Sequence, residues 1–295
     1  DGFPGIQELF SVGAQRYARG DALGGLLSAV DQLLARAELQ EANTWRAEES
    51  GTQGDLALPA ETWRELIVRA IEEHRIKLID FPVLRMQDQG LVHREGVVRL
   101  QTEVDGPWRP AGDFMHFAVR LNLTPSLDMG VARLAVETLR RQPGDFAINL
   151  SAETVADWLF HRRLLELLGA HPEVCARLWL EVPMYGAVNH AEAFRSLCTA
   201  LKGLGCRVGL EQFGRKLGEL DKFADLGIDY VKVDPSFVRG LQDNPGHREL
   251  LSGLCRIVHG IGIQMIAVGV QSEAELEALR ALGVDAVTGP VVREA

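Results

Sequence analysis

The chain has 295 residues, 46% of them apolar and only 6% aromatic, which is enough for one large barrel or two domains with a full core. Its net charge of −10, with no run of Lys and Arg, excludes a binder of duplex nucleic acid, because such a protein needs a basic face. No apolar run reaches the ~18 residues of a membrane span, and the four cysteines lack metal-ligand spacing, as expected of reduced core thiols in a cytoplasmic protein.

Residues 1–46 are predicted to be the end of a separate α/β domain. A strand-like run at 9–14 leads to a helical pattern over 22–40, too little chain for a core of its own. The stretch 47–60 is rich in Gly, Ser, Thr and Glu and is predicted to be a linker to a second domain over 61–295. Because the chain starts at Asp1 rather than Met, we expect further domains upstream, and any membrane contact only through them.

The second domain is predicted to hold eight strands. After a helix from Ala60, the strand-like runs 77–84 and 91–100 are joined by six residues, too few for a crossover helix, so they should form an antiparallel hairpin. Six further runs start 32, 29, 23, 34 and 22 residues apart, the spacing of β/α units. These runs are 146–150, 178–182, 207–211, 230–234, 264–268 and 286–289. The pattern predicts an α/β fold, a (β/α)8 barrel with an antiparallel first strand.

Several helices between these strands have recognisable starts. Ser272 with Glu275, and Asn189 with Glu192, have the spacing of a capping box or a near variant. The pair Asn244-Pro245 combines an N-cap residue with a first-turn proline. Between the strands at 207 and 230, apolar residues at helical spacing predict a helix over 217–226.

Polar residues gather where the predicted strands end, which in a parallel β/α barrel is the functional edge. They are Glu95, Arg99, Asn149, Glu181, Glu211, Gln212, Lys232, Asp234 and Thr288. Carboxylates with an amide oxygen suit Mg²⁺ or Mn²⁺, and a lysine beside them can position a water or neutralise a phosphate. The alternative is a barrel end that is merely polar, with Glu181 and Asn149 bonded to backbone and Lys232 paired with Asp234.

Four segments carry a family resemblance: REGVVRL (94–100), FAINLS (146–151), LWLEVPM (178–184) and YVKVDPSFV (230–238). In this order they resemble the signature strands of the EAL domain, the cyclic di-GMP phosphodiesterase family, whose fold is a modified triosephosphate-isomerase-type barrel with an antiparallel first strand. The positions that match are Glu95, Arg99, Asn149, Glu181, Lys232, Asp234, Ser236 and Phe237. Residues 1–46 similarly resemble the C-terminal part of a GGDEF domain.

The departures from the family pattern concern its two metal ions. The Asp-Asp-Phe-Gly strand reads Glu211-Gln212 here, and Val268, which cannot bind a metal, replaces a glutamate. Other changed positions are Phe81, Gln271, Thr288, Pro290 and the loop 215–219. We therefore expect no working catalytic residue. The resemblance then implies that Lys232 and Asp234 are vestigial catalytic residues, that Glu95, Asn149, Glu181 and Glu211 are vestigial metal ligands, and that Arg99, Lys232 and Asp234 contact a bound nucleotide.

The resemblance thus predicts a catalytically inactive module of bacterial cyclic di-GMP signalling, a receptor or protein-interaction domain with weak or no nucleotide binding. Two alternatives stay open: a residual Mg²⁺- or Mn²⁺-dependent phosphodiesterase, and a regulator of RNA turnover or another partner independent of the nucleotide. No cofactor is expected unless a metal site survives. A protein partner is expected, and a homodimer stays open.

Other aromatic residues are expected to be structural. Predicted to lie at the surface or at helix ends are His74, His93, His116 and His259. Predicted to pack in the core are Trp63, Trp158 and Trp179.

Overall fold

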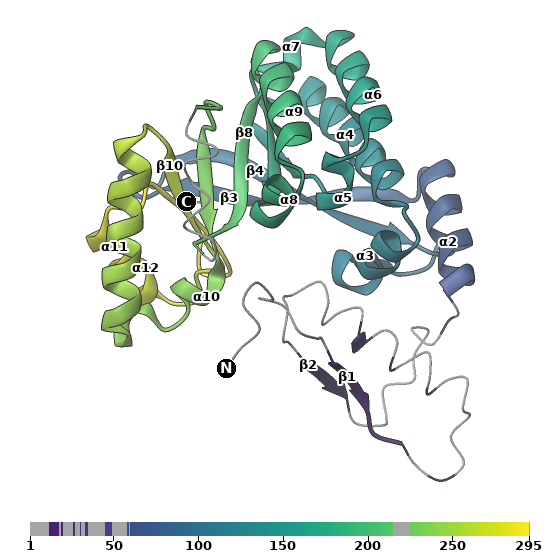
Figure 1. Ribbon diagram of the computed structural model, residues 1–295, viewed down its shortest axis with the longest axis horizontal. Helices are drawn as coiled ribbons and strands as arrows, with labels where there is room; N and C mark the ends of the chain where they lie inside the picture. The colour runs from purple at the N-terminus through teal and green to yellow at the C-terminus, as the bar shows by residue number, and fades with distance from the viewer. Residues whose placement is uncertain are drawn as a thin grey trace. The chain divides into compact units, whose positions relative to one another are not determined.

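The structure is a computed structural model that describes residues 12–17, 19, 26, 30, 33–34, 45–48, 58, 60–214 and 225–294. The chain forms two compact units, one of residues 1–76 with 99–124 and the other of 77–98 with 125–295. Figure 1 shows the elements in chain order. The predicted loop 215–219, most of the predicted helix 217–226 and most of the predicted helix 22–40 lie outside the described residues.

The described residues of the first unit include strands and helices that pair with one another. Its parallel strands β1 (Val12–Gln15) and β2 (Trp45–Glu48) lie side by side in Figure 1. Helices α2 (Ala60–Glu72) and α3 (Ala111–Arg120) pack through stacked rings of Trp63 and Phe117, whose centroids are 4.6 Å apart. Strand β5 (Trp108–Pro110) pairs antiparallel with residues 99–101, the end of strand β4 (Leu91–Gln101). The domain boundaries at 46 and 60 stay predictions.

The second unit is the predicted barrel. Its strands are β3 (Ile76–Arg85), β4 (Leu91–Gln101), β6 (Phe146–Asn149), β7 (Leu178–Pro183), β8 (Arg207–Phe213), β9 (Tyr230–Val233), β10 (Gln264–Val268) and β11 (Ala286–Thr288). They follow the order β3-β11-β10-β9-β8-β7-β6-β4, and a pairing of β3 with β4 closes the ring. Strand β3 runs antiparallel to β11, whereas the other neighbours around the ring from β11 to β4 are parallel. The predicted barrel and its reversed first strand are confirmed.

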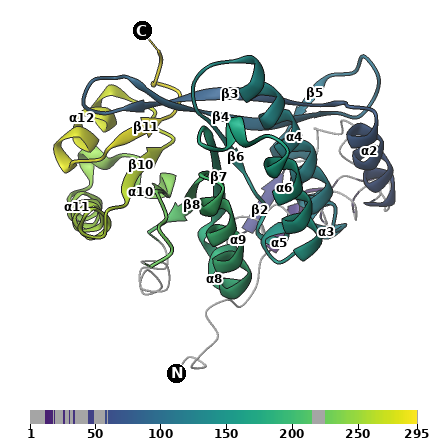
Figure 2. The same cartoon turned by 90° about the horizontal axis from the view of Figure 1, so that it is seen from above.

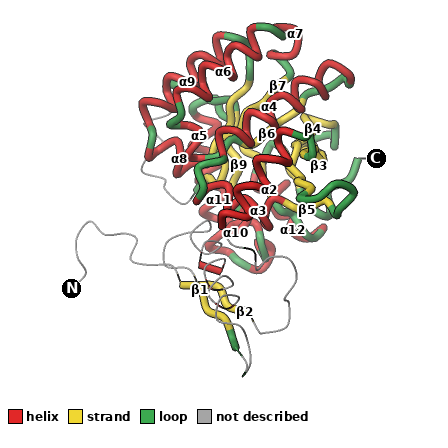
Figure 3. The backbone as a smooth tube through the Cα atoms, turned by 90° about the vertical axis from the view of Figure 1, so that its right-hand side faces the viewer, coloured by secondary structure: helices red, strands yellow, loops and turns green. Residues whose placement is uncertain are grey.

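Helices surround the strands (Figures 2 and 3). They are α4 (Thr124–Arg141), α5 (Ala152–Val155), α6 (Trp158–Gly169), α7 (Pro172–Cys175), α8 (Met184–Asn189), α9 (Ala191–Gly203), α10 (Pro235–Val238), the 3-10 turn η3 (Leu241–Asp243), α11 (Pro245–Gly260) and α12 (Glu273–Leu282). Helix α9 packs on β8, and α11 packs on β10 and α12. None of the described helices is long and apolar enough to cross a membrane. All four cysteines are buried free thiols.

Two of the three predicted helix starts are confirmed. Ser272 forms a reciprocal capping box with Glu275 at the start of α12, and the Asn244 side chain accepts a hydrogen bond from the His247 amide at the start of α11. The predicted cap at Asn189 is wrong. Asn189 is the last residue of α8, so its backbone is already helical, and α9 begins two residues later, at Ala191, with His190 as an N-cap residue whose side chain makes no capping hydrogen bond.

Inward-facing residues fill the barrel in layers, because alternate residues of a strand face the same side. We call the end at which the parallel strands finish the mouth, and the opposite end the foot. Beneath the mouth lies an interior cluster: Val83, Ala147, Trp179, Tyr230, Ile266 and Ala286. A Cβ at Gly209 would lie 2.3 Å from the Tyr230 ring, so only glycine leaves room for this ring inside the barrel.

Candidate functional site

A buried lysine stands at the centre of the mouth. The Lys232 side chain on β9 is 1% exposed, and its Nζ lies 2.6 Å from Glu95 Oε2 on β4 and 2.5 Å from Glu181 Oε2 on β7. Glu211 on β8 is the third carboxylate, with Oε1 3.6 Å from the same nitrogen. We call these four residues the mouth cluster. Four strands, far apart in sequence, thus place three negative groups around one positive group.

Two neighbours orient the carboxylates of the cluster. The Tyr230 hydroxyl donates a 2.7 Å hydrogen bond to Glu181 Oε1, and the Asn149 amide Nδ2 donates a 3.0 Å bond to Glu95 Oε1. The amide oxygen of Asn149 is buried and has no hydrogen-bond partner within the described parts of the chain. An unpartnered buried oxygen is costly unless something binds it, and it is of the kind that hard cations accept as ligands.

The electrostatics of the cluster follow from its excess of negative charge. Burial, reinforced by the carboxylates of Glu95 and Glu211, raises the pKa of Glu181 to about 8 despite the opposing charge of Lys232. Burial also raises the pKa of Glu211. For Glu95, burial acts upward, but the charge and hydrogen bond of Lys232 outweigh it, so this pKa is lowered. For Lys232, burial acts downward, but the three carboxylates prevail and its pKa is raised. The cluster therefore favours binding a further positive charge, either a proton or a cation.

The donor set suits a single divalent cation. One carboxylate oxygen from each of Glu95, Glu181 and Glu211 lies within 4.8 Å of the others. Carboxylate and amide oxygens are the ligands that Mg²⁺ and Mn²⁺ prefer. These three residues with the Asn149 oxygen fit one ion, which would be held next to the Lys232 ammonium. Val268, at the end of β10, supplies no ligand for a second ion.

Strand β8 is irregular beside the cluster. Leu210 is opposite Val231 and Phe213 is opposite Val233, so one extra residue is inserted between them. This is a β-bulge, and it puts Gln212 in the left-handed region with φ of 56°, a strained conformation for a residue with a side chain. The exposed Gln212 side chain offers an amide here, not a charge.

The other predicted site residues have different settings. Asp234 is buried, and its Oδ1 accepts a 2.8 Å hydrogen bond from the Ser236 amide as the N-cap of α10. Arg99 belongs to the first unit, on the end of β4, where its backbone pairs with Pro110. Phe81 on β3 is 44% exposed, although it is apolar, and Thr288 on β11 is nearly buried.

A buried aspartate fixes the chain that follows Asn149. Asp128 on α4 accepts a 2.7 Å hydrogen bond from the Ser151 amide and a second, 3.3 Å, from the Ser151 hydroxyl. Burial raises the pKa of Asp128 to about 6, even though these bonds act in the opposite direction. The segment after β6 is therefore held by an acceptor that can lose its charge in mild acid.

Three aromatic residues under the cluster were not predicted as part of the site. His93, Trp179 and Tyr230 are each at most 1% exposed, with the rings of His93 and Trp179 4.2 Å apart and the His93 Nε2 3.8 Å from Glu181 Oε1. The expected surface position of His93 is wrong. Burial lowers its pKa well below the ordinary value, and Lys232 and Arg207 lower it further. Each of the three lies two residues before a member of the cluster on the same strand, and this spacing was the signal that could have identified them.

Two other aromatic positions also differ from expectation. His116 is buried in α3, where its ring lies 4.0 Å from that of Phe117, because this face of the helix packs inward. Trp158 is 69% exposed at the start of α6, under the guanidinium of Arg162, because it lies on a different face of the helix from the buried residues Phe160, Leu164 and Leu168.

In a comparison with protein families, residues 64–295 match the EAL domain. Among curated proteins, the cyclic di-GMP phosphodiesterase PdeF of Escherichia coli is 25% identical over 229 residues, covering 76% of this chain and 30% of PdeF. The RNase E specificity factor CsrD of the same organism is 23% identical and covers 94% of this chain and 43% of CsrD. The chain thus spans less than half of either relative.

Among solved structures, the S helix-GGDEF-EAL part of Vibrio cholerae LapD, bound to c-di-GMP, superimposes with a TM-score of 0.86. It is 24% identical, and the match covers 95% of this chain and 68% of that one. At this identity the likeness establishes the fold.

Proposed function

The chain belongs to the EAL domain family, and we propose that it is a member that has lost hydrolysis and acts in cyclic di-GMP signalling as a regulatory receptor or protein-interaction domain. Members of this family use Mg²⁺ or Mn²⁺ to cleave the nucleotide. Here Gln212 and Val268 stand where the family pattern has an aspartate and a glutamate. A single ion lacks the clamp by which a pair of ions stabilises both the attacking and the leaving oxygen.

The proposal rests mainly on the ion pairs that the remaining carboxylates form with Lys232. Lys232 already forms ion pairs with Glu95 and Glu181, at 2.6 and 2.5 Å, and is completely enclosed. With its second metal position missing, the cluster is better suited to stabilise the barrel than to activate water. Losing a metal-bound carboxylate removes several kcal/mol of transition-state stabilisation, and each 1.36 kcal/mol is tenfold in rate.

Nucleotide binding is proposed to be weak or absent. Phe81, Val268 and Thr288 replace polar residues of the family pattern, and a polar ligand group that loses its partner costs roughly 1–3 kcal/mol. Arg99, Lys232 and Asp234 are the residues proposed to contact the phosphates if the nucleotide binds. The bound c-di-GMP in the LapD structure supports the receptor form of the proposal. That match also supports assigning residues 1–46 to a GGDEF-like domain, with 47–60 as a linker and 61–295 as the barrel.

Two alternatives have an observation in their favour. The donor set of Glu95, Asn149, Glu181 and Glu211 favours a residual Mg²⁺- or Mn²⁺-dependent phosphodiesterase with one ion. The match to CsrD, which extends over 94% of this chain, favours regulation of RNA turnover through a protein partner. In each case we propose a cytoplasmic protein that acts through a partner, a second copy of the chain included.

The test is calorimetric titration of the chain with cyclic di-GMP, with and without Mg²⁺, followed by chromatography of the nucleotide. Binding near 1 μM without cleavage would identify a receptor, and absence of binding would favour an interaction domain. Cleavage to the linear dinucleotide would overturn the proposal. The matched variant is the double substitution Gln212→Asp with Val268→Glu, which restores both carboxylates. It should bind Mg²⁺ more tightly than the parent, measured by calorimetry with the metal alone.

A further inference from the structure

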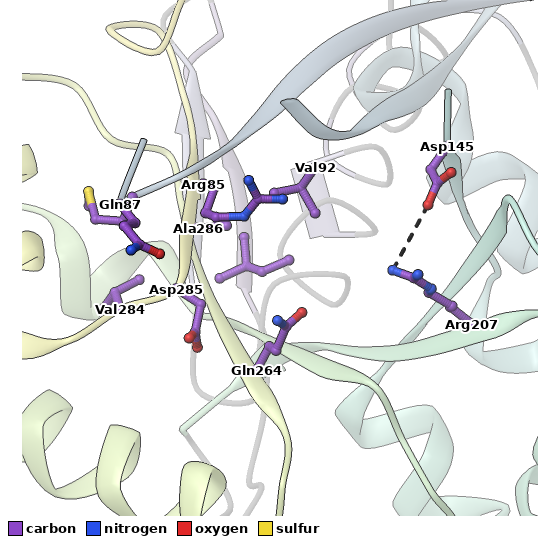
Figure 4. A pocket seen from close by; sticks show the side chains of 11 residues that line it. Arg85, Gln87, Val92, Asp145, Arg207, Gln264, Val284, Asp285 and Ala286 are labelled. Carbon is purple, nitrogen blue, oxygen red and sulfur yellow. Dashed lines mark ion pairs between the residues drawn. The ribbon is translucent and has the colours of Figure 1, made fainter. Parts of the chain in front are cut away.

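The foot of the barrel contains a cavity of about 560 Å³ at the end opposite the mouth cluster (Figure 4). We call it the foot pocket. Its lining comes from the starts of parallel strands and from the end of the reversed strand β3, all within the second unit. The lining residues are Arg85, Met86, Gln87, Val92, Asp145, Arg207, Gln264, Ile266, Val284, Asp285 and Ala286. Binding pockets for small molecules have volumes of about 300–1,000 Å³.

The pocket exists because the lowest layer of the barrel is polar. In barrels of this type each layer takes four side chains from alternate strands, mainly bulky branched ones that close the barrel. Here the layer below the interior cluster consists of Arg85, Asp145, Arg207 and Gln264, from β3, the residue before β6, β8 and β10. Arg85, Asp145 and Gln264 are each two residues away from a member of the interior cluster on the same segment, and Arg207 is two residues away from Gly209. Long polar side chains extend toward solvent at this position, so the barrel is left open from below.

The floor of the pocket is apolar. Ile266 and Ala286 belong to the interior cluster, and Val92 packs against the same cluster. Ile266 is 1% and Ala286 3% exposed, and the small side chain of Ala286 leaves volume that a larger residue would fill. An apolar floor with a few polar groups at its rim is the usual anatomy of a site for a small organic ligand.

The polar rim favours an anion. The two carboxylates have partners in the protein: Asp145 accepts a 2.9 Å hydrogen bond from the Trp179 indole, and Asp285 accepts 2.7 Å bonds from the Met265 amide and from His259. The two guanidinium groups are less committed. The Arg207 guanidinium lies over the Trp179 ring, 4.5 Å from its centroid, and its ion pair with Asp145 is long, at 3.9 Å.

Arg85 uses one nitrogen, Nη1, on the Asp88 carboxylate of its own turn, and both side chains are about half exposed. A guanidinium carries five N–H donors, so several remain for an oxyanion. In Figure 4 the side chains of Arg85 and Arg207 extend toward each other from opposite sides of the pocket.

We propose that the foot pocket binds a small organic anion: an oxyanion group, carboxylate or phosphate, held between Arg85 and Arg207, with an apolar body on Ile266 and Ala286. The amide of Gln264 lies at the rim, where it can bond a polar substituent. This site is separate from the mouth cluster and does not depend on cyclic di-GMP.

The test uses three probes in ligand-observed NMR titrations: phenyl phosphate, phenol and inorganic phosphate. Phenyl phosphate combines the anion with the apolar body, and we expect it to bind with a dissociation constant of about 1 mM. Phenol lacks the anionic group and inorganic phosphate lacks the apolar body, so each of them should bind at least about tenfold more weakly. Equal binding of phenol or of phosphate would overturn the proposal, as would no binding of phenyl phosphate.

Substitutions of pocket residues test whether the probe binds in the foot pocket. Arg207→Gln should weaken the binding of phenyl phosphate about tenfold, which corresponds to the loss of one charged hydrogen bond. Ala286→Leu should abolish binding because the larger side chain fills the floor of the pocket. Arg162→Gln on α6, which changes an exposed arginine outside the pocket, is the matched control. If Ala286→Leu or Arg207→Gln does not fold, judged by circular dichroism, Arg85→Gln provides the same test with a half-exposed side chain. Wild-type affinity in the arginine variants of the pocket would contradict the assignment.

Discussion

Replacing Lys232 by methionine should destabilise the barrel in a pH-dependent way. At an effective dielectric constant of 20, ion pairs at 2.5 and 2.6 Å each represent about 6–7 kcal/mol of attraction, and the contact to Glu211 at 3.6 Å about 5 kcal/mol. Most of this is offset by the cost of burying the ammonium, so removing the lysine should cost about 3–5 kcal/mol, the range for breaking a buried ion pair from one side.

The sign of the pH dependence follows from the pKa directions. The raised pKa of Lys232 keeps this side chain charged far above neutral pH, so its charge in the wild type is the same from pH 5 to 8. In Lys232→Met the three carboxylates face one another without a cation, and the raised pKa values of Glu181 and Glu211 should rise further. Protonation then relieves the repulsion, so the loss of stability should be largest at pH 8 and shrink toward pH 5.

The assay is urea unfolding followed by circular dichroism at pH 8 and pH 5. The matched control is Lys202→Met, which removes a lysine whose Nζ lies 2.7 Å from Asp229 but whose side chain is 31% exposed. That pair should be worth about 1 kcal/mol or less because solvent screens it. Equal losses in the two variants, or a loss at Lys232 that is the same at both pH values, would refute the account of the mouth cluster.

Three further predictions concern the same barrel. Gln212→Gly should stabilise the chain by about 1 kcal/mol in urea unfolding, because it removes the cost of a left-handed backbone at the bulge, and unchanged stability would contradict that strain. The contribution of Asp128 to the free energy of unfolding should fall by about 3 kcal/mol as pH rises from about 3 to about 7, because its carboxyl group keeps its proton to about pH 6 when folded but only to about its ordinary pKa of 3.8 when unfolded; Asp128→Asn should flatten this slope. Gly209→Ala should destabilise by about 1–3 kcal/mol or more in thermal unfolding, because its Cβ would lie 2.3 Å from the Tyr230 ring, whereas Gly203→Ala, in open space on α9, should be neutral or stabilising.

The barrel could be predicted because its strands are short apolar runs separated by helical patterns. The predicted run 264–268 coincides with β10, and 178–182 misses only the last residue of β7. Strand β5 was missed because three residues containing Trp108 and Pro110 carry no periodic signal. A side-chain cap was expected at Asn189 because its spacing from Glu192 is right, but tertiary structure continues α8 through that residue.

The charged residues of the candidate site could be predicted from their residue type and their position at the ends of strands. Glu95, Glu181, Glu211 and Lys232 are charged residues at strand ends, and the structure brings them together. The bulge at Gln212 has no sequence signal, because it depends on the register between two strands. The foot pocket was also invisible, because its polar residues are unremarkable singly and only ring closure places them in one layer.

Because β3 runs in the opposite direction to the other strands, the turn that joins it to β4 lies at the foot of the barrel. Residues 87–89, in the turn that joins β3 to β4, are exposed and polar, and turns of this kind tolerate insertions. Because Gln87 lines the foot pocket and Asp88 bonds Arg85, changes in this turn alter the foot of the barrel while leaving the residues of the mouth cluster unchanged.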